Sequence, residues 1–178
     1  MYYNSFYRIT KYNPKFRDEH DRYQVDDWTA AADVGKQFPG GVLSFAEYMR
    51  TEDAYVASLL QAWELAGRPE MTIAGFEANE LRLSKAHLAK TPELRVIIEE
   101  PLPEEGQVLR EQAEIERVIR LVLREFIWCK LKSSSDFYAH FGWDYYMYCG
   151  GVELDDSTRQ KIGERGLFVE VGVASPYG

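Results

Sequence analysis

The sequence predicts an α+β fold: a single domain over residues 1–178 in which two long helices pack on one mostly antiparallel sheet. The length of 178 residues is typical of one domain. Hydrophobic residues make up 46% and charged residues 28% of the chain, a balance found in globular rather than disordered proteins. Segments with the two-residue period of strands lie before, between and after two segments with the 3.6-residue period of amphipathic helices.

The first predicted strand covers residues 5–11, and a long polar segment follows it. The strand ends at Asn13-Pro14, because the residue before a proline avoids helical backbone angles and proline has no N–H to donate. Residues 14–43 are only weakly periodic, and a connection of this length is unusual in a compact domain. We expect an irregular segment that Trp28 and Phe38 hold down, with a short helix at residues 29–34.

The first long helix is predicted between Ser44 and Gly67. Ser44 is expected to be its N-cap, and Glu47 three residues later completes a capping box. Gly67 and Pro69 end the helix, since both residue types favour termination. Apolar residues recur along one face at Phe45, Tyr48, Met49, Tyr55, Val56, Leu59, Leu60 and Trp63.

The middle of the chain predicts short strands and the second long helix. Strands are expected at residues 71–76 and 94–98, with a short helix at residues 80–90 between them. The second long helix follows a turn rich in proline and glutamate, and its apolar stripe runs from Val108 to Val122. Phe126 continues the helical stripe, but residues 126–131 also alternate as a strand, so the boundary between the two elements stays open.

Residues 137–149 predict a β-hairpin with two aromatic faces. The face expected in the core holds Phe137, Phe141, Tyr145 and Met147. The opposite face holds Tyr138, Trp143, Tyr146 and Tyr148. If helices cover both faces, all these rings are core; if one face is open, the second set forms a contact surface rich in tyrosine. A helix capped by Asp156 and a strand from residue 167 to 173 complete the chain.

The charge of the chain limits its partners. The formal net charge is −8, which repels phosphate backbones and anionic lipid, so we expect no nucleic acid and no membrane partner. The opening residues lack an apolar signal segment, and Cys129 and Cys149 fit reduced thiols, so a cytoplasmic protein is expected. A protein partner is expected instead, for a chain that is itself a monomer or homodimer.

Sequence motifs for catalysis, cofactors or metals are absent. The two glycine pairs lack the frame of a phosphate-binding loop, and the histidines and cysteines lack the spacing of a metal site. We therefore predict no cofactor and no metal. One enzymatic arrangement stays open, in which His140 and Asp144 meet near Cys129 or Cys149, because an imidazole beside a thiolate is a catalytic pair.

Acidic residues gather before and within the start of the second long helix. Three interpretations stay open: solvated negative charge near a helix N-terminus, a patch that binds a basic partner, or a pair of catalytic carboxylates. The residues concerned are Glu99, Glu100, Glu104, Glu105, Glu111 and Glu114.

Four strings carry a resemblance: FYRITKYNP, REFIWCKL, FYAHFGWDYYMYCG and GLFVEVGVASPY. Their combination resembles a group of small, uncharacterised bacterial proteins, and some proteins of this general appearance act as immunity proteins against secreted toxins. The resemblance implies a bacterial origin and carries over no functional residue.

These observations favour a non-catalytic protein-binding module, most concretely an acidic immunity-type inhibitor that occludes the active site of a basic toxin. The acidic residues named above, together with Asp144, Tyr146 and Tyr148, are the expected partner-binding residues. The alternative is an enzyme of unknown reaction whose site lies around His140, Asp144 and Cys129.

Overall fold

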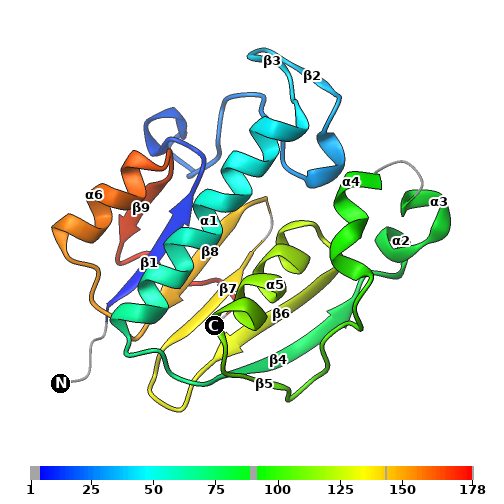
Figure 1. The fold of residues 1–178 in the computed structure, drawn as a ribbon. Coiled ribbons are helices and arrows are strands. Elements are labelled where there is room, and N and C mark those ends of the chain that lie inside the picture. The colour runs from blue at the N-terminus through cyan, green and yellow to red at the C-terminus, as the bar shows by residue number, and fades with distance from the viewer. Residues whose placement is uncertain (1–4, 89–91, 143, 178) are drawn as a thin grey trace.

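A seven-stranded antiparallel sheet with the strand order β5-β4-β6-β7-β8-β1-β9 is the centre of the structure (Figure 1). The structure is a computed structural model that describes residues 5–88, 92–142 and 144–177. It confirms the predicted α+β fold. Trp143, expected at the hairpin turn, lies outside the described residues.

The strands of the sheet pair in an order that brings the two ends of the chain together. Strand β1 lies between β8 and β9, with Arg8 opposite Tyr148 on one side and opposite Glu170 on the other. The strands of the sheet are β1 Phe6–Thr10, β4 Met71–Ala78, β5 Val108–Leu109, β6 Ile127–Lys132, β7 Tyr138–Phe141, β8 Tyr146–Gly150 and β9 Phe168–Val171. Strands β2 Gln37–Phe38 and β3 Gly41–Val42 form a separate hairpin within the long segment.

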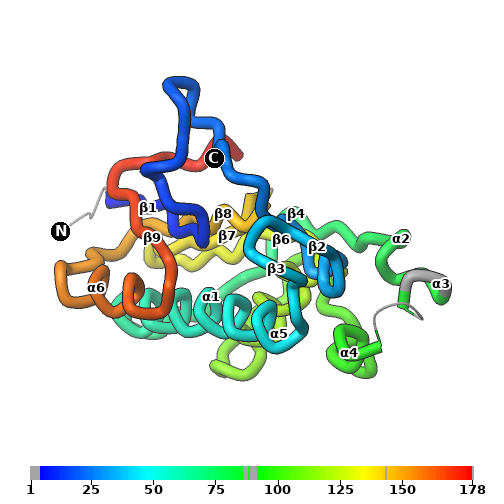
Figure 2. Tube along the Cα trace, turned by 90° about the horizontal axis from the view of Figure 1, so that it is seen from above, coloured from blue at the N-terminus to red at the C-terminus, as the bar shows by residue number. Residues whose placement is uncertain are grey.

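The three longest helices cover one face of the sheet (Figure 2). They are α1 Phe45–Leu65, α5 Gln112–Leu123 and α6 Asp156–Glu164. The two long predicted helices are therefore confirmed, and α6 is a third. The predicted cap at Ser44 is also confirmed, because its Oγ accepts the N–H of Glu47 at 3.1 Å. The cap of α6 is Asp155 rather than the expected Asp156, and Asp155 accepts the N–H of Thr158 at 2.7 Å.

The predicted strand at residues 94–98 is wrong. Pro92 opens the helical turn α4 Pro92–Arg95, and the 3₁₀ turn η3 Val96–Ile98 follows it. A short apolar run fits a strand or a buried helical turn equally well, and proline in the first turn of a helix favours the second. Val108, expected at the start of the second helix, instead belongs to β5 and pairs with Thr72.

Other short elements refine the expectations for the irregular parts of the chain. The helix expected at residues 80–90 is divided into α2 Glu80–Leu83 and α3 Lys85–Leu88, and its last two residues lie outside the described part. The long segment contains the 3₁₀ turns η1 Pro14–Phe16 and η2 Ala31–Asp33. Trp28 anchors this segment in the core with an exposed fraction of 6%.

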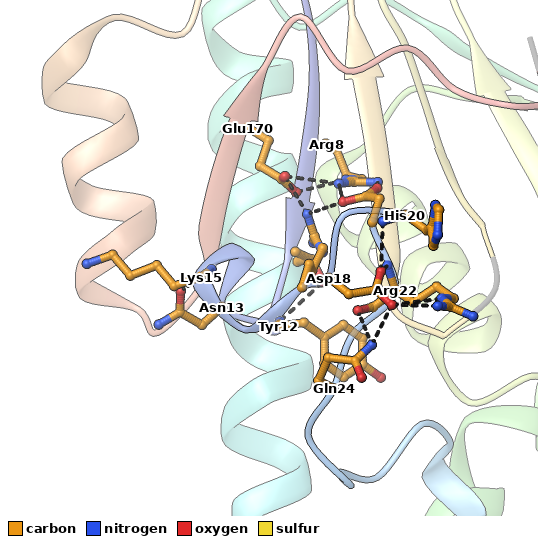
Figure 3. A network of polar contacts seen from close by, with 12 residues as sticks. Arg8, Tyr12, Asn13, Lys15, Asp18, His20, Arg22, Gln24 and Glu170 are labelled. Carbon is orange, nitrogen blue, oxygen red and sulfur yellow. Dashed lines mark hydrogen bonds and ion pairs between the residues drawn. The ribbon is translucent and has the colours of Figure 1, made fainter.

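The second face of the sheet is covered by loops rather than helices. Figure 2 shows residues 11–30 and the chain after β9 on the side of the sheet opposite the helices. Arg8 on β1 donates to Glu170 and to Asp21, and Arg17 donates to the same two carboxylates (Figure 3). Tyr146 lies beneath them, with the Arg8 guanidinium 5.2 Å from its ring centre. Neither expectation for this face, open or helix-covered, describes it.

Buried charges join α1 to α5 on the helical side. Glu52 has no exposed surface and accepts hydrogen bonds from Arg120 and Arg124 at 2.7 Å. Tyr48 also donates to Glu52, and Tyr145 reaches Tyr48 at 3.4 Å, so the network extends to the hairpin turn. Within the described ranges, no helix combines the length and the apolar character that crossing a membrane requires.

Candidate functional site

A cleft of about 600 Å³ lies at the end of the sheet where β4 and β7 end and β6 begins. Four carboxylate side chains line it: Glu77, Glu80, Glu125 and Asp144. Four aromatic side chains line it as well: Trp128, Phe141, Tyr145 and Tyr177. No lysine, arginine or histidine among the described residues lines the cleft. The cleft is therefore negative with aromatic walls, and its volume is in the range of ligand sites.

Local backbone irregularity places two of the carboxylates. The pairing of β4 with β6 shifts register between Ala74 and Glu77, and Gly75 in this bulge has a φ of +66°. A bulge redirects the following side chains, which brings Glu77 to the rim of the cleft. Asn79 then accepts the N–H of Arg82 as an N-cap, so that Glu80 becomes the first residue of α2.

Glu125 lies at the position that ends α5. The N–H of Glu125 donates to the carbonyl of Val122, and the N–H of Phe126 donates to the carbonyl of Leu121. These two hydrogen bonds together form a Schellman motif. The φ of Glu125 is +60°, where glycine is the usual residue. Its carboxylate forms an ion pair with Arg82 at 2.5 Å. Burial raises the pKa of Glu125, and the charges of Asp33 and Asp144 add to this rise while Arg82 opposes it.

The turn between β7 and β8 contributes Asp144 and Tyr145. Both residues have positive φ angles, of 59° and 62°. Tyr145 is held firmly, since its hydroxyl donates to the carbonyl of Leu123 at 2.8 Å and its own carbonyl accepts from Tyr55 at 2.5 Å. Asp144 remains exposed beside it. The turn therefore contributes one fixed, buried ring and one exposed carboxylate to the lining of the cleft.

Trp128 and Tyr177 form two of the aromatic walls of the cleft. The indole N–H of Trp128 donates to the carbonyl of Phe141 at 2.9 Å, and its ring lies against Gly75 of the neighbouring strand. Tyr177 arrives from the end of the chain, and its carbonyl accepts from Lys130 on β6. Gly142 leaves room for Tyr177, because a Cβ there would lie 3.1 Å from the tyrosine ring.

Of the predicted partner-binding residues, only Asp144 lines the cleft. The six glutamates from Glu99 to Glu114 are exposed around β5, the edge strand, and the start of α5. Three of them have side-chain contacts: Glu105 accepts the N–H of Phe76 at 2.7 Å, Glu114 accepts that of Glu111 at 2.9 Å, and Glu100 forms an ion pair with Arg117 at 3.4 Å. These contacts fit the interpretation as local structural charge.

Tyr146 and Tyr148 lie on the loop-covered face of the sheet. Tyr148 is only 5% exposed, and Tyr146 is half-buried beneath Arg8 and Arg17. Tyr148 stacks on His140 with ring centres 5.4 Å apart. A partner can therefore reach Tyr148 only after the covering segments move.

The enzymatic alternative is not assembled in the structure. His140 pairs with Lys130 across β6 and β7, so it shares the face of Lys130, whereas Cys129 points to the helical side. Burial lowers the pKa of His140 to about 4 and raises the pKa of Cys129 to about 12. The thiol therefore stays protonated near neutral pH, and the imidazole that would activate it is on the other face.

Asp144 was predicted from sequence, but the other three carboxylates of the cleft were not. Glu77 and Glu80 lie far from Glu125 in the sequence, and a glutamate at the end of a helix gives no sign of its left-handed backbone. Within the described part of the chain, no group of three His, Cys, Asp or Glu side chains has the arrangement to hold a metal ion. No protein-family model, curated protein or solved structure matches the chain.

Proposed function

We propose that this chain is a non-catalytic protein-binding module, an acidic immunity-type inhibitor that neutralises a basic bacterial toxin by covering its active site. The observation that carries the proposal is the cleft, whose described lining contains four carboxylates and four aromatic rings but no basic side chain, although Arg82 pairs with Glu125 from outside the lining. Aromatic side chains dominate binding hot spots, and carboxylates select a cationic partner.

The exposed glutamates around β5 support the same proposal. A net charge of −8 accelerates the approach of a basic protein, because long-range attraction raises the association rate. Glu99 and Glu104 are exposed members of this group. In the proposal they steer the partner, while the cleft holds it after contact.

The test begins with the partner. A basic toxin encoded beside this gene, or a basic protein recovered from the native host, should bind the purified chain and lose its activity at a 1:1 ratio. The association rate should fall as salt rises, and the double variant E99K/E104K should associate about tenfold more slowly. The control E19K/E64K makes the same charge change at Glu19 and Glu64, whose side chains are 87% and 47% exposed.

Two results would contradict the proposal. One is a host without a basic binding partner and without a neighbouring toxin gene. The other is a partner that binds this chain yet keeps its full activity in the complex.

A further inference from the structure

The side chains that line the cleft indicate which chemical group would bind there, whereas the net charge of the chain indicates only that a partner would be basic. Its carboxylates come from three directions: Glu77 and Glu80 from β4 and α2, Glu125 from the end of α5, and Asp144 from the hairpin turn. A cation in the cleft would meet acceptors on several sides. A lysine or arginine on the surface of a partner can contact several of these carboxylates at once only when its side chain enters the cleft.

The aromatic walls of the cleft also favour one kind of cation over another. The hydrogen bond from Trp128 to Phe141 and the contact with Gly75 fix the indole, and the Tyr177 ring lines the same cleft. Planar cations bind favourably to the faces of such rings. A guanidinium group stacks on aromatic rings and spreads five donors in one plane, whereas an ammonium group is a compact, strongly hydrated point charge.

Glu125 and Asp144 are the most telling pair of carboxylates. Both line the cleft, and burial raises the pKa of Glu125, with smaller contributions in the same direction from the charges of Asp33 and Asp144. Arg82 already forms an ion pair with Glu125, while Asp144 is an exposed residue of the cleft lining. An additional cation between the two carboxylates relieves their repulsion.

We propose that the cleft is a socket for one arginine side chain of the basic partner, seated between Trp128 and Tyr177 and paired with Glu125 and Asp144. This inference rests on the proposed function for its source of arginine. The volume of about 600 Å³ accommodates one side chain with part of the backbone beside it.

The first experiment uses a blocked tripeptide, acetyl-Gly-Arg-Gly-amide, as the probe. Binding is followed by NMR through the indole N–H of Trp128, which the W128F variant assigns. Affinity for so short a peptide should be weak, on the order of millimolar, because a single exposed ion pair contributes little. The matched peptide with citrulline, the uncharged isostere of arginine, should bind at least about tenfold more weakly, and the lysine peptide should be intermediate.

The second experiment changes the carboxylates. Asp144→Asn keeps a residue type that tolerates a positive φ, and Glu125→Gly suits the left-handed backbone, so both variants should fold. Each should weaken the arginine peptide by about threefold or more, and together by about tenfold. Glu19→Gln removes one charge at a side chain that is 87% exposed and lies outside the cleft, and it should bind the peptide as the parent does.

Three outcomes overturn the inference: equal binding of the arginine and citrulline peptides, tighter binding of the lysine peptide, or an equal loss with Glu19→Gln. The last result would assign the effect to net charge alone. These outcomes are separate from the proposed function. If the arginine peptide binds as expected but no basic protein binds, the arginine site is supported and the inhibitor proposal fails. If a toxin is inhibited equally by the parent and the D144N/E125G variant, the inhibitor proposal stands and the socket fails.

Discussion

At the scale of single residues, His140 makes the free energy of unfolding depend on pH in the mildly acidic range. Burial lowers its pKa to about 4, and Lys130 and Lys132 oppose its protonation as well. The unfolded chain takes up this proton near pH 6.5, before the folded chain does. Folding stability should therefore be complete above pH 6.5 and fall towards pH 4, by at most about 1.4 kcal/mol per pH unit for this one group.

The measurement compares urea unfolding of the parent and His140→Phe at pH 7.0, 6.0 and 5.0. Phenylalanine keeps a ring between Tyr138 and Tyr148, which stack on His140 with ring centres 6.4 and 5.4 Å away. The other histidines cancel in the difference. The variant should lose part of the pH slope, and parallel slopes in the two proteins would show that His140 is protonated equally in both states.

At the scale of elements, two glycines are expected to respond to alanine in opposite directions. Gly163 lies inside α6 with open space around its missing Cβ, so Gly163→Ala should stabilise the protein by about 0.5–1 kcal/mol. Gly151 follows β8 with a φ of +73°, and a Cβ there would lie 2.2 Å from the backbone carbonyl oxygen of Asp136. Gly151→Ala should cost about 3 kcal/mol or more. Thermal and urea unfolding measure both, and equal effects would contradict the described turn.

Elements set by local chemistry were the ones that the sequence predicted well. The cap at Ser44 needs only Glu47 nearby, and the strands of the hairpin follow from alternation over a few residues. The errors arose where distant residues decide. Val108 extends a plausible helical stripe, but pairing with Thr72 makes it a strand. The apolar run at 94–98 has strand-like composition, yet Leu94 is buried as part of a helical turn.

At the scale of the whole molecule, the cleft depends on topology that no short segment encodes. Thr29, Glu77, Glu125, Asp144 and Tyr177 meet there from positions spread over most of the chain. Asp144 was expected to bind a partner because of the tyrosines beside it in sequence. The structure instead groups it with carboxylates from β4 and α5, because the strand order places those ends together.

The carboxylate of Glu170 on β9 links the strand near the C-terminus to β1 and the segment that follows β1, and the last prediction concerns this link. Glu170 accepts from Arg8 at 2.8 Å and from Arg17 at 2.5 Å, and the two arginine side chains are only 10% and 4% exposed. Burial would raise the pKa of Glu170, but hydrogen bonds from the two arginines hold it below its ordinary value. Its contribution is therefore complete above the ordinary glutamate pKa and is lost as the pH falls through the lowered one.

Glu170→Gln should cost about 2–4 kcal/mol, because it preserves shape but leaves two poorly hydrated guanidinium groups with Asp21 as their one remaining carboxylate partner among the described residues. Asp21→Asn is the matched control. The side chain of Asp21 is 59% exposed, so water can replace it and the expected cost is below about 1 kcal/mol. Urea unfolding at neutral pH compares the two variants. Equal small costs would mean that water already compensates the arginines, and that β1 is held between β8 and β9 by its backbone pairing and apolar contacts alone.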